Sequence, residues 1–144
     1  MTLSVTRLTP TIGAVVEGID LSEPLTDANF ADVSRALVEH HVLFFRDQAL
    51  TPAQQRDFAA RFGQLHVHPI YPNHPEAPEV IVLDSDLTDL QDNAIWHTDV
   101  TFTERPPMGS VLAARVLPET GGDTLWASTA AAYDALSQPM QEFL

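Results

Sequence analysis

Near the N-terminus, short apolar runs are separated by glycines, a pattern typical of short strands joined by turns. Val5 to Leu8 and Ala14 to Val16 are predicted strands, with turns at Gly13 and Gly18. Val42 to Phe45 is a continuous apolar run of strand length, and it predicts a buried strand.

Two helices are marked by their capping residues. Thr26 is the predicted N-cap of a helix from Asp27 to about His40, where apolar residues recur on one face. The second helix carries a stronger signal, because Thr51 and Gln54 have the spacing of a capping box and Pro52 occupies the first helical position. It is predicted to end at Gly63.

The remainder is predicted to be richer in strand than in helix. Prolines predict a loop over residues 73–78, and the acidic residues 84–92 predict a second, irregular loop. Val80 to Leu83 and Gly109 to Val116 are aliphatic and predict strands, Gly121-Gly122 predicts a turn, and Ser128 or Thr129 is predicted to cap a helix through Leu136, with a short amphipathic segment from Pro139 to Leu144.

Composition excludes several classes of protein. The chain has 144 residues with seven arginines or lysines against twenty acids, a net charge of −13, which disfavours binding to nucleic acid. It has no cysteine, so any metal must be bound by His, Asp or Glu. Since no apolar run is long enough to span a bilayer and no secretory signal is evident, the predicted location is the cytoplasm, without membrane partners.

The segment from Asn93 to Phe102 contains His97-x-Asp99. In an extended chain, side chains two residues apart point to the same side, so this imidazole and carboxylate would converge. Such a pair supplies two of the three protein ligands in the 2-His-1-carboxylate site of non-haem Fe(II) oxygenases. The alternative is a surface histidine beside a solvated aspartate, which is the commoner outcome for this short motif.

Four segments together resemble the taurine dioxygenase family of Fe(II)/2-oxoglutarate-dependent dioxygenases, and the similarity covers nearly all of the chain. They are Ile12-Gly13-Ala14, Leu65 to Tyr71, Asn93 to Phe102 and Pro118 to Trp126, which contains Gly-Gly-Asp-Thr-Leu-Trp. The resemblance implies a mainly β fold with flanking helices, a double-stranded β-helix (jelly roll) of clavaminate-synthase-like type. Residues 1–144 would be the N-terminal part of one catalytic domain.

The resemblance also implies site residues. His97 and Asp99 would bind Fe(II), and the Thr124 hydroxyl would help to bind the cosubstrate 2-oxoglutarate. Positions that match the sulfonate pocket of the family are His68, Tyr71, Asn93 and Val100. Without the resemblance, Thr124 would be an ordinary strand residue, and the segment from His68 to Tyr71 an ordinary turn with an exposed histidine. His66-x-His68 could form a second metal pair, whereas Trp96 and Trp126 are predicted to pack in the core.

One departure from the family pattern is prominent. No histidine follows His97, and the last arginine is Arg115, whereas family members place a second histidine ligand and two arginines in their C-terminal part. The chain is therefore expected to correspond to an N-terminal half, with the closing strands of the barrel missing. Half a barrel leaves strand edges unpaired, which favours self-association into a homo-oligomer.

The resulting hypothesis is an oxygenase that hydroxylates taurine, or a close alkylsulfonate, next to sulfur. O2 and 2-oxoglutarate would be consumed, and sulfite, an aminoaldehyde, succinate and CO2 released, which would serve sulfur scavenging. The 144 residues alone are predicted to be inactive. The alternatives are an alkylsulfatase or another 2-oxoglutarate dioxygenase of the family, a non-catalytic fragment that keeps the fold, or a zinc module built on His66, His68, His97 and Asp99.

Overall fold

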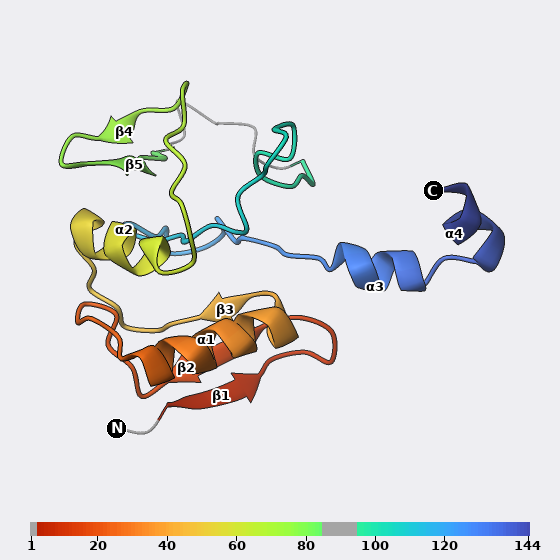
Figure 1. Ribbon diagram of the computed structural model, residues 1–144, viewed down its shortest axis with the longest axis horizontal. Helices are drawn as coiled ribbons and strands as arrows, with labels where there is room; N and C mark the ends of the chain where they lie inside the picture. Colours follow the sequence, from red (N-terminus) through yellow and green to blue (C-terminus); the bar gives the residue numbers. More distant parts are fainter. Residues whose placement is uncertain (1–2, 85–94) are drawn as a thin grey trace. The chain divides into compact units, whose positions relative to one another are not determined.

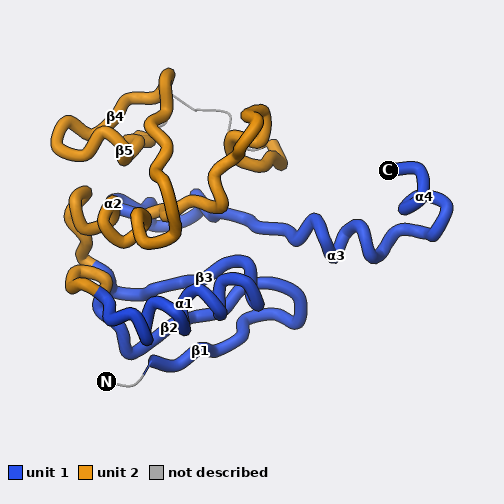
Figure 2. The backbone as a smooth tube through the Cα atoms, in the orientation of Figure 1, with its two compact units in different colours: residues 1–20, 25–48, 114–144 blue, residues 21–24, 49–113 orange. Residues whose placement is uncertain are grey.

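The computed structural model describes residues 3–84 and 95–144, and the chain divides into two compact units. Unit 1 comprises residues 1–20, 25–48 and 114–144, and unit 2 comprises residues 21–24 and 49–113 (Figure 2). None of the described helices has the length and apolar character needed to cross a membrane.

Unit 1 is built on a three-stranded sheet of order β1-β2-β3 (Figure 1). β1 (Ser4–Arg7) runs antiparallel to β2 (Ala14–Glu17), and β2 runs parallel to β3 (Leu43–Phe44). Helix α1 (Asp27–His40) packs against β2 and β3. Its core consists of small and β-branched side chains, which allow the helix to approach the sheet closely: Ala14, Val16, Val33 and Ala36.

The predicted start of α1 is confirmed. The Thr26 hydroxyl accepts a hydrogen bond from the backbone N–H of Asn29 at 3.2 Å, as an N-cap residue should. The strand that follows is only partly as predicted, because β3 has two residues and these are half-buried. Its register with β2 explains the short length, since only Leu43 and Phe44 have partners across the pair.

The C-terminal part of unit 1 contains two short helices, α3 (Thr129–Asp134) and α4 (Gln138–Phe143). Ser128 caps α3 as predicted, accepting the N–H of Ala131. The two helices are joined by reciprocal hydrogen bonds between Tyr133 and Gln141, each side chain bonding the other residue's backbone.

Unit 2 begins with α2 (Pro52–Ala60), and its capping box is complete. The Thr51 hydroxyl accepts from the Gln54 N–H at 3.2 Å, and the Gln54 carbonyl oxygen accepts from the Thr51 N–H at 2.8 Å. Two glutamines connect this helix to distant segments of the same unit, because Gln54 donates to the Ser22 carbonyl and Gln55 to the Val111 carbonyl.

Residues 73–78 are not the loop predicted from their prolines. They form a tight hairpin of β4 (Asn73–His74) and β5 (Ala77–Ile81), in which β5 packs against α2. The Nδ1 atom of His74 accepts the Glu76 N–H at 3.2 Å and closes the turn between the strands. β5 therefore starts three residues before the predicted strand at Val80 and includes Pro78.

The strand predicted from Gly109 to Val116 is absent, although every residue of this segment is described. A strand requires a neighbour for its backbone groups, and this segment has no ladder partner in the described part of the chain. Met108, Leu112 and Val116 are 65%, 65% and 91% exposed. The described residues thus form a mixed α and β structure with two small sheets, in place of the mainly β structure expected.

Candidate functional site

His97 and Asp99 converge as predicted. The imidazole Nε2 lies 3.2 Å from the Asp99 carboxylate Oδ1, and both side chains are more than half exposed. The other ring nitrogen, Nδ1, is 2.7 Å from the backbone carbonyl oxygen of Ile95. Because a carbonyl oxygen can only accept, Nδ1 is the donor in this contact, and a neutral imidazole then has its lone pair on Nε2.

This geometry fits a metal cation between the two side chains. Metal-bound histidines commonly donate their second N–H to a backbone carbonyl, and the Ile95 carbonyl accepts such a bond from His97 Nδ1. Two cis ligands, each about 2.1 Å from a metal in octahedral geometry, are separated by roughly 3 Å. The Nε2–Oδ1 separation of 3.2 Å is close to that value. Without a cation, Nε2 must carry a proton in order to hydrogen-bond Asp99. The two side chains therefore either form an ion pair with each other or bind a cation between Nε2 and Oδ1.

A compact turn after His97 holds Asp99 in place. Val100 has φ +55, a conformation that is unusual for a β-branched residue and costs about 1–3 kcal/mol. Hydroxyl groups stabilise the turn, because Thr103 Oγ1 donates to the Val100 carbonyl at 2.9 Å and the hydroxyls of Thr98 and Thr101 are 3.0 Å apart. Strain next to a candidate ligand pair is typical of functional sites.

The sequence analysis missed these threonines as parts of the site. Their signal is visible in retrospect, because three of them surround Asp99 in His-Thr-Asp-Val-Thr-Phe-Thr, and threonine hydroxyls commonly bond to nearby backbone in turns.

His68 and Tyr71, two predicted substrate-binding residues, are in contact. Their rings are 4.8 Å apart, and His68 Nδ1 accepts the backbone N–H groups of both Ile70 and Tyr71 at 3.2 Å. The ring of His66 meets that of His68 edge-on at 5.9 Å. His68 therefore organises a turn, and its Nδ1 is occupied as an acceptor of N–H groups.

The other three predicted site residues lie in different parts of the chain. Asn93 lies outside the described residues. Val100 is half-buried in the turn beside Asp99, whereas Thr124 is exposed and belongs to unit 1. Two residues after Thr124, the Trp126 ring packs edge-on against Phe44 with centroids 5.3 Å apart.

Two hypotheses from the sequence are wrong. No three His, Cys, Asp or Glu residues are grouped to hold a metal within residues 3–84 and 95–144, so a zinc module of His66, His68, His97 and Asp99 is not formed. Trp96 and Trp126 were predicted in the core but are 67% and 44% exposed. Trp96 lies in a segment with little regular structure, where an indole has no sheet or helix to pack against.

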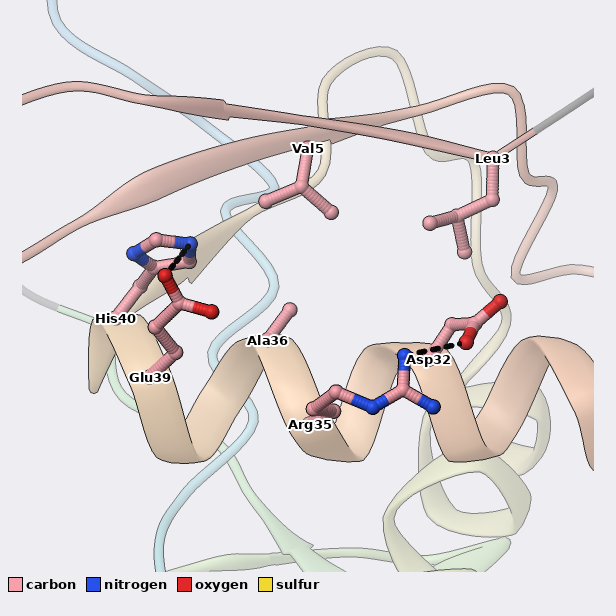
Figure 3. Close-up of a pocket in the computed structure, with 7 residues that line it drawn as sticks. All are labelled: Leu3, Val5, Asp32, Arg35, Ala36, Glu39 and His40. Carbon is pink, nitrogen blue, oxygen red and sulfur yellow. Dashed lines mark hydrogen bonds and ion pairs between the residues drawn. The ribbon is translucent and has the colours of Figure 1, made fainter.

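Unit 1 also has a surface cavity of about 260 Å³ between β1 and α1 (Figure 3). Leu3, Val5 and Ala36 form its apolar wall. Its charged groups pair with each other or with a neighbour, since Arg35 contacts Asp32 at 2.9 Å and Glu39 contacts Arg7 at 3.2 Å. These seven lining residues include none of the predicted site residues, and the paired charges favour a structural role: Leu3, Val5, Asp32, Arg35, Ala36, Glu39 and His40.

Known proteins resemble the chain along its whole length. It is 40% identical to an alkylsulfatase of Acinetobacter baylyi, over 98% of this chain and 44% of that protein. A crystal structure of a taurine dioxygenase from Burkholderia xenovorans superposes with a TM-score of 0.86 at 38% identity, covering 98% of this chain and 50% of the other. A further structure, AAD-2 in complex with Mn(II) and N-oxalylglycine, has a TM-score of 0.80 and 34% identity, covering 99% of this chain and 50% of that one.

These matches show how much of the relatives' fold the chain covers. The chain spans about half the length of the relatives it matches, so its units correspond to part of a taurine-dioxygenase fold. The predicted jelly roll is supported to that extent. The model of the family "Taurine catabolism dioxygenase TauD, TfdA family" matches residues 4–144, and the chain belongs to that family.

Proposed function

We propose that the protein carrying this chain is an Fe(II)/2-oxoglutarate-dependent dioxygenase that oxidises the carbon next to sulfur in taurine or a close alkylsulfonate. The observation that carries the proposal is the His97 Nε2–Asp99 Oδ1 pair, with His97 Nδ1 engaged by the Ile95 carbonyl. Family membership supports this interpretation over that of a solvated surface pair.

The chain's own residues would bind and orient the reactants. His97 and Asp99 would be two of the iron ligands, and bound iron would supply the O2 activation that is coupled to oxidation of 2-oxoglutarate. The Ile95 carbonyl orients the His97 ring, and the Thr103 hydroxyl bonds the backbone of Val100, the residue after Asp99. The Thr124 hydroxyl is proposed to hydrogen-bond a carboxylate of 2-oxoglutarate.

On the substrate side, a sulfonate requires directed hydrogen-bond donors. An imidazole, a phenol and an amide each supply one, and these are His68, Tyr71 and Asn93. The contact between the His68 and Tyr71 rings supports a shared role for the first two. Val100 is proposed to supply an apolar contact to the substrate.

A second candidate substrate is an alkyl sulfate ester, which the similarity to the Acinetobacter baylyi alkylsulfatase favours. A sulfate ester presents the same three terminal oxygens but is linked to carbon through a fourth oxygen. Hydroxylation next to that oxygen would release sulfate and an aldehyde. Hydroxylation of taurine would release sulfite and aminoacetaldehyde.

The products distinguish these reactions. The protein carrying this chain is supplied with Fe(II), ascorbate, O2 and 2-oxoglutarate, with either taurine or a linear alkyl sulfate. Succinate, sulfite and sulfate are then measured separately. Taurine-dependent succinate with equimolar sulfite supports the first substrate, and sulfate from the ester supports the second. No succinate with either compound, when iron is bound, supports a non-catalytic fragment. Asp99→Ala, which removes a proposed ligand, is the control.

A further inference from the structure

The His68 ring is held by two backbone amides. The N–H groups of Ile70 and Tyr71 both point at Nδ1, each with a nitrogen–nitrogen distance of 3.2 Å. His68 also fixes the far end of the same turn, because its carbonyl oxygen accepts the Asn73 side-chain amide at 3.4 Å. The side chain is half-buried.

These contacts determine which ring nitrogen carries the proton. A backbone N–H can only donate, so Nδ1 must present its lone pair, and the proton of a neutral imidazole is then on Nε2. His97 has the opposite arrangement, since its Nδ1 faces the carbonyl oxygen of Ile95, which can only accept. Nδ1 is therefore an acceptor in His68 and a donor in His97.

We propose that the Ile70 and Tyr71 amides are positioning groups that hold His68 in the Nε2–H tautomer, so that it selects an anionic oxygen of the substrate. A metal ion or a hydrogen-bond donor on the ligand would find no lone pair at Nε2, whereas a sulfonate or sulfate oxygen would find a fixed donor. The nature of the ligand rests on the proposed function; the tautomer rests on the two amide contacts alone.

Replacement of His68 by alanine is a poor test, because it would remove the turn together with the donor. Asparagine and aspartate both keep a side-chain oxygen that can accept the Ile70 and Tyr71 N–H groups, as such residues do in turns. Only asparagine also retains an N–H donor. His68→Asn and His68→Asp are thus a matched pair that preserves the turn and differs in the donor.

The tautomer is measured on the 144-residue chain by two-bond ¹H–¹⁵N correlation spectroscopy of labelled imidazoles. The His68 resonances are assigned by their loss in His68→Asn. We expect the Nε2–H pattern for His68, with Nδ1 unprotonated. An Nδ1–H pattern for His68, or an even mixture of the two tautomers, would overturn the proposal.

The second arm tests anion selection with methanesulfonate and its neutral analogue, dimethyl sulfone. Methanesulfonate is expected to shift the His68 Nε2 resonance, whereas dimethyl sulfone at equal concentration leaves it in place. The dissociation constant for methanesulfonate should be at least about tenfold weaker in His68→Asp than in His68→Asn, measured by the Tyr71 resonances. Equal responses to the two probes, or equal dissociation constants in the two variants, overturn the proposal. If the proposed function alone fails, the Nε2–H tautomer of His68 is still observed, whereas the protein carrying this chain forms no iron-dependent succinate.

Discussion

Substitution of Asp99 by asparagine tests whether Asp99 is a metal ligand or only the partner of His97 in a structural ion pair. The variant keeps the shape of the side chain and one neutral oxygen but removes the negative charge. The His97–Asp99 contact is 3.2 Å, with the two side chains 58% and 63% exposed. Exposed ion pairs of this kind contribute about 0.2–1 kcal/mol, so we expect Asp99→Asn to lower the free energy of unfolding by no more than about 1 kcal/mol.

The effect on cation binding should be much larger. Loss of an outer residue that supports a metal ligand typically costs about 10–100-fold in affinity, and Asp99 is proposed as a ligand itself. Since the described residues contain no group of three or more His, Asp or Glu side chains that could hold a metal, we expect Asp99→Asn to weaken Mn(II) binding by at least roughly 100-fold. Free Mn(II) is measured by electron paramagnetic resonance, and unfolding by urea titration followed by circular dichroism.

Asp134→Asn is the matched control, because it removes an exposed carboxylate at the end of α3. It should leave Mn(II) affinity unchanged. Equal Mn(II) affinity in Asp99→Asn and the unsubstituted chain would refute the metal assignment. A loss of unfolding free energy well above 1 kcal/mol with little change in affinity would show that the pair is structural.

Four further predictions follow from individual contacts. Thr51→Ala should lower the free energy of unfolding by about 0.5–2 kcal/mol in urea, because α2 loses its N-cap. Thr103→Val should cost about 1 kcal/mol and weaken Mn(II) binding, because the hydroxyl bonded to Val100 is lost; unchanged affinity would contradict a role for the turn. Gly122→Ala should cost about 1–3 kcal/mol by thermal melting, because φ is +68 and the new Cβ would lie 3.0 Å from Pro118 Cγ. The isolated chain should form no succinate, whereas rates near those of full-length relatives would require a third ligand outside the described pair.

The helices could be predicted from the sequence because their signals are local. Thr26 lies at the start of α1, and the Thr51–Gln54 box at the start of α2, within a few residues of the groups that they satisfy. The energy of a cap depends on the chain around it and little on distant packing. Both predictions are confirmed for that reason.

The strands were less predictable, because a strand is defined by its partner. Gly109 to Val116 has the composition of a strand but no ladder partner in the described chain, and it remains irregular. Residues 73–78 have the composition of a loop, yet β4 and β5 pair across a two-residue turn. Composition alone therefore predicted a strand where none forms and a loop where two strands pair.

The convergence of His97 and Asp99 could be predicted, because a spacing of two residues is itself geometric information. Metal binding by this pair stays a prediction. The strain at Val100 could not be predicted, because nothing in a valine side chain favours φ +55.

Which nitrogen of a histidine ring donates and which accepts is not visible in the sequence. His68 and His97 are the same residue type, but amide N–H groups approach Nδ1 of one and a carbonyl oxygen approaches Nδ1 of the other. The first contact leaves the proton of a neutral imidazole at Nε2. The second keeps a proton at Nδ1, so that a cation could replace the Nε2 proton that faces Asp99. A neutral donor suits a sulfur oxyanion, and a neutral acceptor suits a divalent cation. The backbone around each histidine, through atoms common to every residue, thus gives two identical side chains opposite polarity at Nδ1, in keeping with the substrate-binding role proposed for His68 and the metal-binding role proposed for His97.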